Sequence, residues 1–190
     1  MGKRLFIAIK IIPDGVFMNH LLSLQQKLQG ERIKWVEAQN IHITLKFLGD
    51  TNESKVSMLQ HSLEGICTQF HSITFFLKDL GIFGSHYHPK VIWIGIEPFE
   101  EIKELMIAIH QSLEKVGFPV DRQNLVPHLT LGRIKELNNP TFFWKIFNQY
   151  KSISSKQISI NDIVLYESIL KKEGPLYINL TSCSLIQKRP

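Results

Sequence analysis

The stretches IHITL (residues 41–45) and PHLTL (residues 127–131) share one pattern, a histidine and a threonine separated by one apolar residue and followed by leucine. Alternate side chains of a β-strand point to the same face. Each stretch, as a strand, therefore presents an imidazole and a hydroxyl on one face and apolar side chains on the other. Two such strands side by side would form a cleft lined by His42, Thr44, His128 and Thr130.

The repetition of this pattern is more informative than either copy. The chain has 8 histidines and 7 threonines in 190 residues, and random placement would give roughly 0.3 tripeptides of this kind. A lone histidine on an amphipathic strand is typically a solvated or hydrogen-bonded residue. Two copies in corresponding halves of the chain instead indicate a shared site, and this set of groups suits metal-free acid–base chemistry on a phosphate.

Length and composition are those of one ordinary globular domain, with 44% hydrophobic and 21% charged residues. A net charge of +5 permits an anionic partner such as RNA. No run of 18 apolar residues occurs, so we expect no membrane segment. Cys67 and Cys183 form no Cys-x-x-Cys pair, which favours a reducing, cytoplasmic setting. We expect the chain to be a monomer.

Other candidate sites are weaker. The run His86-Tyr87-His88 could suggest a metal pair, but it lacks a third ligand at usable spacing, and contact with substrate at the rim of the cleft is the alternative. Trp35, Trp93 and Trp144 are expected to anchor the core or strands rather than to stack on bases. The chain has no Gly-rich phosphate loop, Cys/His zinc set or Ser-centred nucleophile motif. We therefore expect no metal and no cofactor.

The order of predicted elements indicates a duplication, with repeats at roughly 1–84 and 88–190. Helical periodicity predicts helices at 21–28, 53–70, 102–116 and 140–150. Apolar runs predict strands at 4–12, 73–80, 91–96, 124–134, 157–170 and 176–185, and residues 33–48 are predicted to hold a short strand around Trp35 and then the first His-x-Thr strand. We expect a turn at Gly49-Asp50 and a loop over 81–89. Helices interleaved with strands through short connections indicate α+β layers, which we interpret as one duplicated, bilobal domain over residues 1–190.

Several segments also resemble a known family. They are RLFIAI (4–9), IKWVEAQNIHITLKFLGD (33–50), VIWIGI (91–96), VPHLTLGRIK (126–135), VLYES (164–168) and GPLY (174–177). In this order they resemble the bacterial and archaeal RNA 2′,3′-cyclic phosphodiesterases, also called 2′-5′ RNA ligases, of the two-histidine (2H) phosphoesterase superfamily. The resemblance implies a pseudo-twofold, bilobal fold with two mainly antiparallel sheets flanked by helices and a central cleft.

The resemblance also implies roles. His42 would be the proton donor and His128 the proton acceptor, while Thr44 and Thr130 would bind the phosphate. Arg133 would be a further phosphate contact. Strict strand alternation puts Arg133 on the face opposite to His128, so we expect a bulge at Gly132 to turn it into the cleft.

Lys46 is a further candidate on the first strand. It continues the series 42, 44, 46 along the polar face. We expect it to add positive potential to the cleft as a phosphate-binding group, or else to be a solvated lysine at the end of the strand.

The expected activity is hydrolysis of RNA ends that carry a 2′,3′-cyclic phosphate to 2′-phosphomonoesters. One histidine would activate water while the other protonates the leaving ribose oxygen. The reverse reaction, 2′-5′ RNA ligation, follows from the resemblance and from reversibility. Two alternatives stay open: a related phosphodiesterase acting on another nucleotide, such as a 2′-5′ oligonucleotide or ADP-ribose cyclic phosphate, and a non-catalytic module that binds RNA ends.

Overall fold

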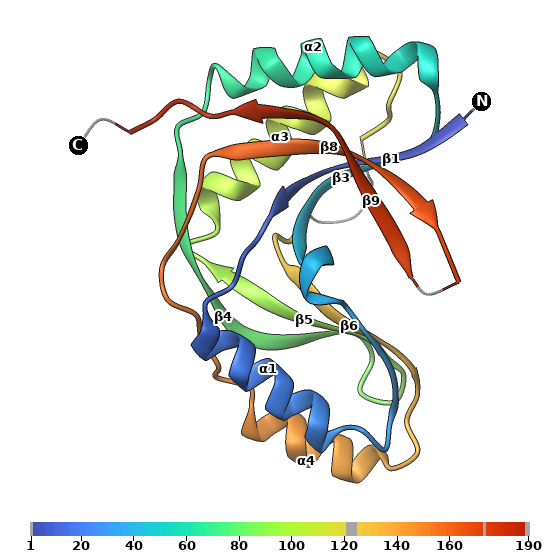
Figure 1. The fold of residues 1–190 in the computed structure, drawn as a ribbon. Coiled ribbons are helices and arrows are strands. Elements are labelled where there is room, and N and C mark those ends of the chain that lie inside the picture. Colours follow the sequence, from blue (N-terminus) through green and yellow to red (C-terminus); the bar gives the residue numbers. More distant parts are fainter. Residues whose placement is uncertain (1, 121–124, 173, 189–190) are drawn as a thin grey trace.

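The computed structural model describes residues 2–120, 125–172 and 174–188. The helices in these ranges are α1 (Gly15–Lys27), α2 (Val56–Cys67), α3 (Glu100–Glu114), α4 (Pro140–Gln149) and the short 3-10 helices η1 (Ala38–Asn40) and η2 (Glu53–Lys55). The strands are β1 (Gly2–Lys10), β2 (Arg32–Trp35), β3 (His42–Asn52), β4 (Ile73–Gly84), β5 (Pro89–Glu97), β6 (Leu129–Glu136), β7 (Ile158–Ile160), β8 (Asp162–Leu170) and β9 (Pro175–Ser184). Figure 1 traces them through two lobes, and the α+β class expected from the sequence is confirmed.

The strands pair antiparallel in the order β7-β4-β5-β6-β3-β1-β8-β9, with β2 also beside β6. The sheets expected for the two lobes are thus one continuous, curled sheet. The connection between them is narrow, because β3 and β6 share only the pair Ile43–Leu129 within the described residues.

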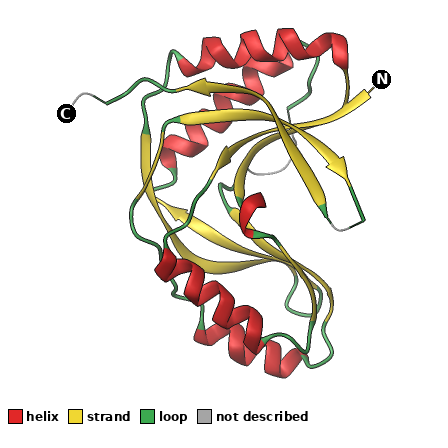
Figure 2. Cartoon of the chain, in the orientation of Figure 1, coloured by secondary structure: helices red, strands yellow, loops and turns green. Residues whose placement is uncertain are grey.

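Each lobe combines elements from both halves of the chain. Helices α1 and α4 contact each other beside β4, β5 and β6, whereas α2 and α3 contact each other beside β1, β3, β8 and β9 (Figures 1 and 2). Phe17 of α1 and Phe143 of α4 are both fully buried. The buried faces of both helix pairs belong to one continuous hydrophobic core, which includes Phe17 and Phe143 as well as Leu63 of α2 and Leu105 of α3.

Helix α1 begins where the sequence provides a capping residue. Asp14 Oδ1 accepts hydrogen bonds from the backbone N–H groups of Val16 at 2.9 Å and Phe17 at 3.0 Å. Oδ2 of the same carboxylate accepts from the N–H of Lys156 at 2.7 Å. One side chain thus satisfies free N–H groups at the helix start and ties the helix to the segment that follows α4.

The strands run further than the turn signals predicted. The turn expected at Gly49-Asp50 is wrong, because β3 continues to Asn52 and pairs both residues with β1. Gly49 has φ +70, which a glycine adopts without strain. The loop expected over 81–89 is shorter than predicted, since β4 pairs with β5 as far as Gly84. The start of the strand predicted at 124–134 lies outside the described residues at position 124.

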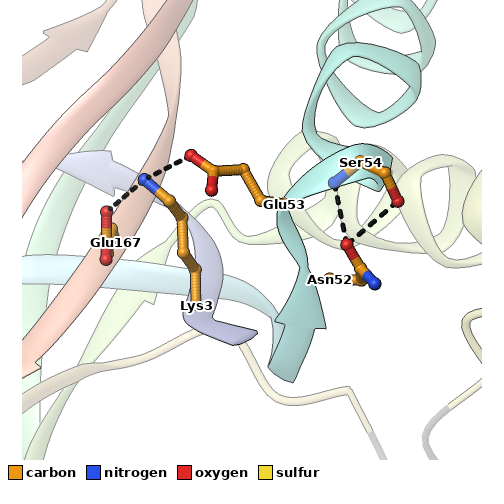
Figure 3. Close-up of polar contacts among 5 residues, drawn as sticks. All are labelled: Lys3, Asn52, Glu53, Ser54 and Glu167. Carbon is orange, nitrogen blue, oxygen red and sulfur yellow. Dashed lines mark hydrogen bonds and ion pairs between the residues drawn. The ribbon is translucent and has the colours of Figure 1, made fainter. Parts of the chain in front are cut away.

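The N-terminal strand is held by charge as well as by its neighbours (Figure 3). Lys3 Nζ lies 3.0 Å from a carboxylate oxygen of Glu167 on β8 and 3.4 Å from one of Glu53 in η2. These hydrogen bonds, that of Glu167 first, raise the pKa of Lys3 above its ordinary value. Asn52 Oδ1 accepts from both the N–H and the hydroxyl of Ser54, each at 3.0 Å, and so caps η2. The outer end of β1 is thus fixed to β8 and to the start of the α2 segment.

Candidate active site

The single residue pair that joins β3 to β6 lies in the middle of the two His-x-Thr segments. Ile43 and Leu129 face each other in antiparallel register, and both are fully buried. A local twofold axis therefore relates the two segments. Continued by one residue on either side, this register sets each histidine opposite the threonine of the other segment: His42 with Thr130, and His128 with Thr44.

This arrangement puts the two imidazoles on a diagonal. Directly opposite Cβ atoms in such a pair are about 4.5–5.5 Å apart and diagonal ones about 7–8 Å. His42 and His128 are on diagonally related positions, and both are half-buried. The spacing leaves room for a tetrahedral phosphate between two imidazoles, with a threonine hydroxyl beside each.

A β-bulge brings Arg133 to the same face. Consecutive residues of β5 pair with Gly132 and Thr130, so Leu131 is an extra residue on β6. The extra residue changes the alternation, and Arg133 lies on the face of Thr130. The bulge expected at Gly132 is thus present, one residue earlier in the chain.

A second bulge overturns the expectation for Lys46. Consecutive residues of β1 pair with positions 46 and 44 of β3, so Leu45 is extra. Lys46 therefore points away from the cleft and is 2% exposed. Its Nζ donates to the carbonyl of Pro119 at 2.8 Å and to Nδ1 of His110 at 3.4 Å, while His110 Nε2 lies 3.1 Å from the Leu45 carbonyl. The prediction that Lys46 lines the polar face is wrong.

The two bulges fall at corresponding places, one residue after each threonine. Phe47 and Arg133 consequently occupy corresponding positions, three residues after Thr44 and Thr130. Phe47 is 59% exposed and lies 6.3 Å from the ring of Phe6 on the cleft face of β1. The cleft thus has an aromatic side and a cationic side, although its four central residues are related by symmetry.

Both histidine rings are held in one orientation by the same device. Nδ1 of His42 donates to the backbone carbonyl of Asn40 at 2.6 Å, and Nδ1 of His128 donates to that of Val126 at 2.8 Å. Each acceptor is two residues before its histidine. Since Nδ1 carries the proton in these bonds, Nε2 is the ring nitrogen left to exchange protons with a ligand.

The surroundings lower the pKa of both histidines below the ordinary value of 6.5. Burial is the main cause in each case, because it disfavours the charged imidazolium. The carbonyl that accepts from Nδ1 opposes this effect, and the positive charge of Arg133 lowers each pKa further. The charge of His128 also lowers the pKa of His42. Both rings are therefore mainly neutral at pH 7 until an anion lies between them.

Aromatic side chains from distant strands complete the walls of the site. The ring of His42 lies 5.2 Å from Phe6 and 5.3 Å, edge-on, from Tyr177 of β9. The ring of His128 lies 4.7 Å, edge-on, from Phe83 of β4. These contacts supply much of the burial that shifts the histidines. They were missed from the sequence because no spacing connects β1, β4 or β9 to either motif.

The other described histidines are not gathered into a metal site. Among residues 2–120, 125–172 and 174–188, no three His, Cys, Asp or Glu side chains are grouped so that they could hold a metal ion. His86 stacks on Trp144 at 4.5 Å instead. In the described part of the chain, no helix is long and apolar enough to cross a bilayer.

Comparison with known proteins agrees with this geometry. The family model described as LigT like Phosphoesterase matches the chain twice, over residues 12–93 and 95–177. An RNA 2′,3′-cyclic phosphodiesterase of Archaeoglobus fulgidus is 33% identical over 178 residues, which are 93% of this chain and 97% of that protein.

Solved structures share the fold. TT0787 of Thermus thermophilus superimposes with a TM-score of 0.80 at 23% identity, over 98% of this chain and all of that one. Escherichia coli LigT complexed with 3′-AMP has a TM-score of 0.72 at 21% identity, over 97% of this chain and 99% of that one. With two matches of the family model that each include one His-x-Thr segment, and a curated relative of almost equal length, this chain belongs to the LigT-like phosphoesterase family.

Proposed function

We propose that this chain hydrolyses the 2′,3′-cyclic phosphate at the 3′ end of RNA and leaves a 2′-phosphomonoester. The observation that carries the proposal is the diagonal placement of two oriented histidines across the Ile43–Leu129 pair. The substrate class comes from the relatives, which are named RNA 2′,3′-cyclic phosphodiesterases. The 3′-AMP in the complex of E. coli LigT is a nucleotide of related chemistry.

The proposed reaction is an in-line displacement. His128 Nε2 takes a proton from water as the water oxygen attacks phosphorus. His42, protonated at Nε2, gives its proton to the 3′-oxygen as the bond between phosphorus and that oxygen breaks. The 2′-oxygen keeps the phosphate. The donor and acceptor roles follow the family resemblance, because the local twofold axis alone does not distinguish the two rings.

Binding of the anionic substrate also changes the protonation state of the two histidines. Both histidines are held mainly neutral in the free protein, and a phosphate anion between them raises the pKa of each. His42 can therefore take up the proton that it must donate as the substrate binds.

Thr44, Thr130 and Arg133 would stabilise the phosphate. The two hydroxyls donate hydrogen bonds to non-bridging oxygens without adding charge, and the guanidinium stabilises negative charge that grows in the transition state. Ring strain in the five-membered cyclic ester lowers the remaining barrier. This set of groups supports chemistry without a metal.

The asymmetry of the cleft gives the substrate a direction. Phe47 lies beyond Thr44 on β3 and Arg133 lies beyond Thr130 on β6, so the two side chains are at opposite ends of the paired segments. Because one side is apolar and the other cationic, a nucleotide has one preferred orientation, and one of its two ribose oxygens faces the proton donor. The same site, run backwards, would join a 5′-hydroxyl to the cyclic phosphate as a 2′-5′ bond.

We also propose that the chain acts as a monomer in the cytoplasm. Cys67 and Cys183 are both buried as free thiols, which suits a reducing compartment.

The decisive experiment is product analysis. The protein is incubated between pH 5 and 8 with an oligoribonucleotide that ends in 2′,3′-cyclic phosphate, and the product is compared with 2′- and 3′-phosphate standards by ³¹P NMR. We expect the 2′-phosphate. A 3′-phosphate product would reverse the assigned roles. Binding without any product would favour a module that only holds RNA ends, and turnover restricted to 2′-5′ oligonucleotides or ADP-ribose cyclic phosphate would identify a different 2H enzyme.

A further inference from the structure

A groove beside the candidate active site is lined by neither His42 nor His128. It has a volume of about 1040 Å³ and lies between the β4–β5 connection, the end of β6 and the start of α4. Figure 1 shows the connection and the helix at the same end of one lobe. Arg133 belongs to both places, because it lines the groove and its charge acts on both histidines. The groove is thus continuous with the cleft through Arg133.

The charge of the groove is positive. Lys90, Arg133 and Lys135 line it. Among the described residues that line the groove, Glu136 is the one acidic residue, and its carboxylate is paired with Arg32 outside the groove, so its charge is neutralised. An anionic ligand therefore fits this surface.

A cross-strand pair supports the same conclusion. Lys34 of β2 lies directly opposite Arg133, and like charges in that position repel each other. Neither side chain forms an ion pair within the described residues, and both are exposed. A phosphate between these two cations would relieve the repulsion.

The groove also presents aromatic faces. The ring of His86 stacks on Trp144 at 4.5 Å, and the ring of Tyr87 meets His86 edge-on at 5.7 Å. Tyr87 is 86% exposed, so packing within the protein does not account for its position. The loop that carries these rings is closed by two hydrogen bonds between Ser85 and His88, of 3.0 and 3.3 Å. The rings are thus presented on a fixed turn.

We propose that this groove binds the nucleotides that precede the terminal cyclic phosphate of an RNA strand. The inference rests on the proposed function, since the cleft must hold the 3′-terminal nucleotide. Cations along a channel and aromatic faces beside it are the two features with which proteins bind single-stranded nucleic acids. From Thr130 to Lys135 the strand covers roughly 15 Å at about 3.3 Å per residue. The groove therefore holds the phosphate before the terminal nucleotide near Arg133, with bases stacked on Tyr87 and His86.

The test compares two substrates. One is a mononucleotide 2′,3′-cyclic phosphate, which fills only the cleft, and the other is a tetranucleotide with the same end. Wild-type kcat/KM should be higher for the tetranucleotide. Tyr87→Ala should lower kcat/KM at least roughly fivefold for the tetranucleotide, the scale of one lost base stack, and leave the mononucleotide unchanged. Tyr87→Phe, which keeps the ring, should behave as wild type.

The charges are tested by salt dependence. Lys135→Ala should reduce the slope of log KM against log salt concentration by about 0.7 for the tetranucleotide, as expected for one lost phosphate contact on a single strand. Lys145→Ala is the matched control. It removes the same charge from an exposed position on α4 outside the groove, and its slope should equal that of wild type.

Any other result would contradict the proposal that the groove binds RNA. Equal losses on both substrates would mean that Tyr87 supports the catalytic cleft, and no loss on either would mean that RNA runs elsewhere. If the wild type turned over neither substrate, the proposed function would fail separately. Fluorescence anisotropy with a labelled tetranucleotide would then decide the groove by itself: weaker binding of Tyr87→Ala supports it, and equal binding or none refutes it.

Discussion

Replacing His42 and His128 one at a time should separate the proton donor from the proton acceptor. The two rings are related by symmetry and share the same type of Nδ1 hydrogen bond. With the natural substrate, alanine at either position should lower kcat by roughly 10²–10⁴, the usual contribution of a positioned acid or base. The double variant should be little worse than the poorer single variant, because both groups act in one transition state.

A substrate with sulfur in place of the 3′-oxygen removes the symmetry. A thiolate leaves with a conjugate pKa of about 8.5, so it needs no proton from the enzyme, whereas a ribose oxygen does. His42→Ala should therefore recover most of the lost factor of roughly 10²–10⁴ on the 3′-thio cyclic phosphate. His128→Ala should recover little, because water must still be deprotonated.

The assay follows release of the thiol with a colorimetric reagent, in parallel with product analysis for the oxygen substrate. Glutamine at each position is the control for packing, since His42→Ala would leave a cavity against Phe6 and Tyr177. Circular dichroism and thermal unfolding check that every variant is folded. Recovery by His128→Ala rather than His42→Ala would refute the assigned roles, and near wild-type turnover of either single variant would refute acid–base catalysis by the pair.

Four further outcomes follow from the same geometry. The kcat/KM profile against pH should be bell-shaped with its optimum below pH 6.5, because the pKa values of His42 and His128 are both lowered. Arg133→Ala should move both limbs of the profile to higher pH, because it removes a positive charge that lowers both pKa values. Unchanged limbs would contradict this electrostatic effect. Activity should survive EDTA, and loss that one divalent ion restores would contradict metal-free chemistry. Lys46→Met should lower the free energy of unfolding by about 1–3 kcal/mol in urea, the cost of breaking a buried polar contact, yet leave KM for the mononucleotide unchanged. Asp14→Ala should cost about 1–2 kcal/mol through the lost helix cap. Partial burial raises the pKa of Asp14, but hydrogen bonds from three N–H groups lower it by more, so the net pKa is lowered. The contribution of Asp14 to the free energy of unfolding is therefore present above its pKa in the unfolded chain, near 4. The difference in stability between wild type and Asp14→Ala should shrink as the pH falls through the lower pKa of the folded protein.

The core of the site was predictable because its signal is local. The period of two puts His42 and Thr44 on one face, and the repeat at His128 and Thr130 doubles the signal. The repeat and the family resemblance both indicated that the two segments lie side by side, but neither predicted that they pair at Ile43 and Leu129. The structure gives their contact a physical form, in which the apolar residue between each histidine and threonine forms the shared pair.

The sequence-based prediction was wrong where it assumed that side chains alternate between the two faces of a strand without interruption. An extra residue after each threonine changes the face of everything beyond it. The family resemblance implied that Arg133 contacts the phosphate, and Gly132 allowed for the bulge that such a position requires. At Leu45 no glycine or proline marks the same event, and Lys46 was therefore given to the wrong face. The continuation of β3 through Gly49 was missed because Gly49-Asp50 is a typical turn sequence, yet it lies inside a strand.

The exchange of elements between the halves has a consequence for how the protein is made. Strand β1 (residues 2–10) pairs with β8 (residues 162–170), and α1 packs against α4 (residues 140–149). During translation the first half leaves the ribosome with apolar faces on α1, α2 and β1 whose partners have not been synthesised. Helix α1 has no helical partner until α4 emerges, and β1 has no second neighbour until β8 emerges, so folding is late and depends on distant contacts. A chain that ends before β8 would leave one edge of β1 unpaired, and this edge could pair with a strand of another chain. Incomplete translation products of this enzyme are therefore expected to be substrates for chaperones and proteases rather than partly active lobes.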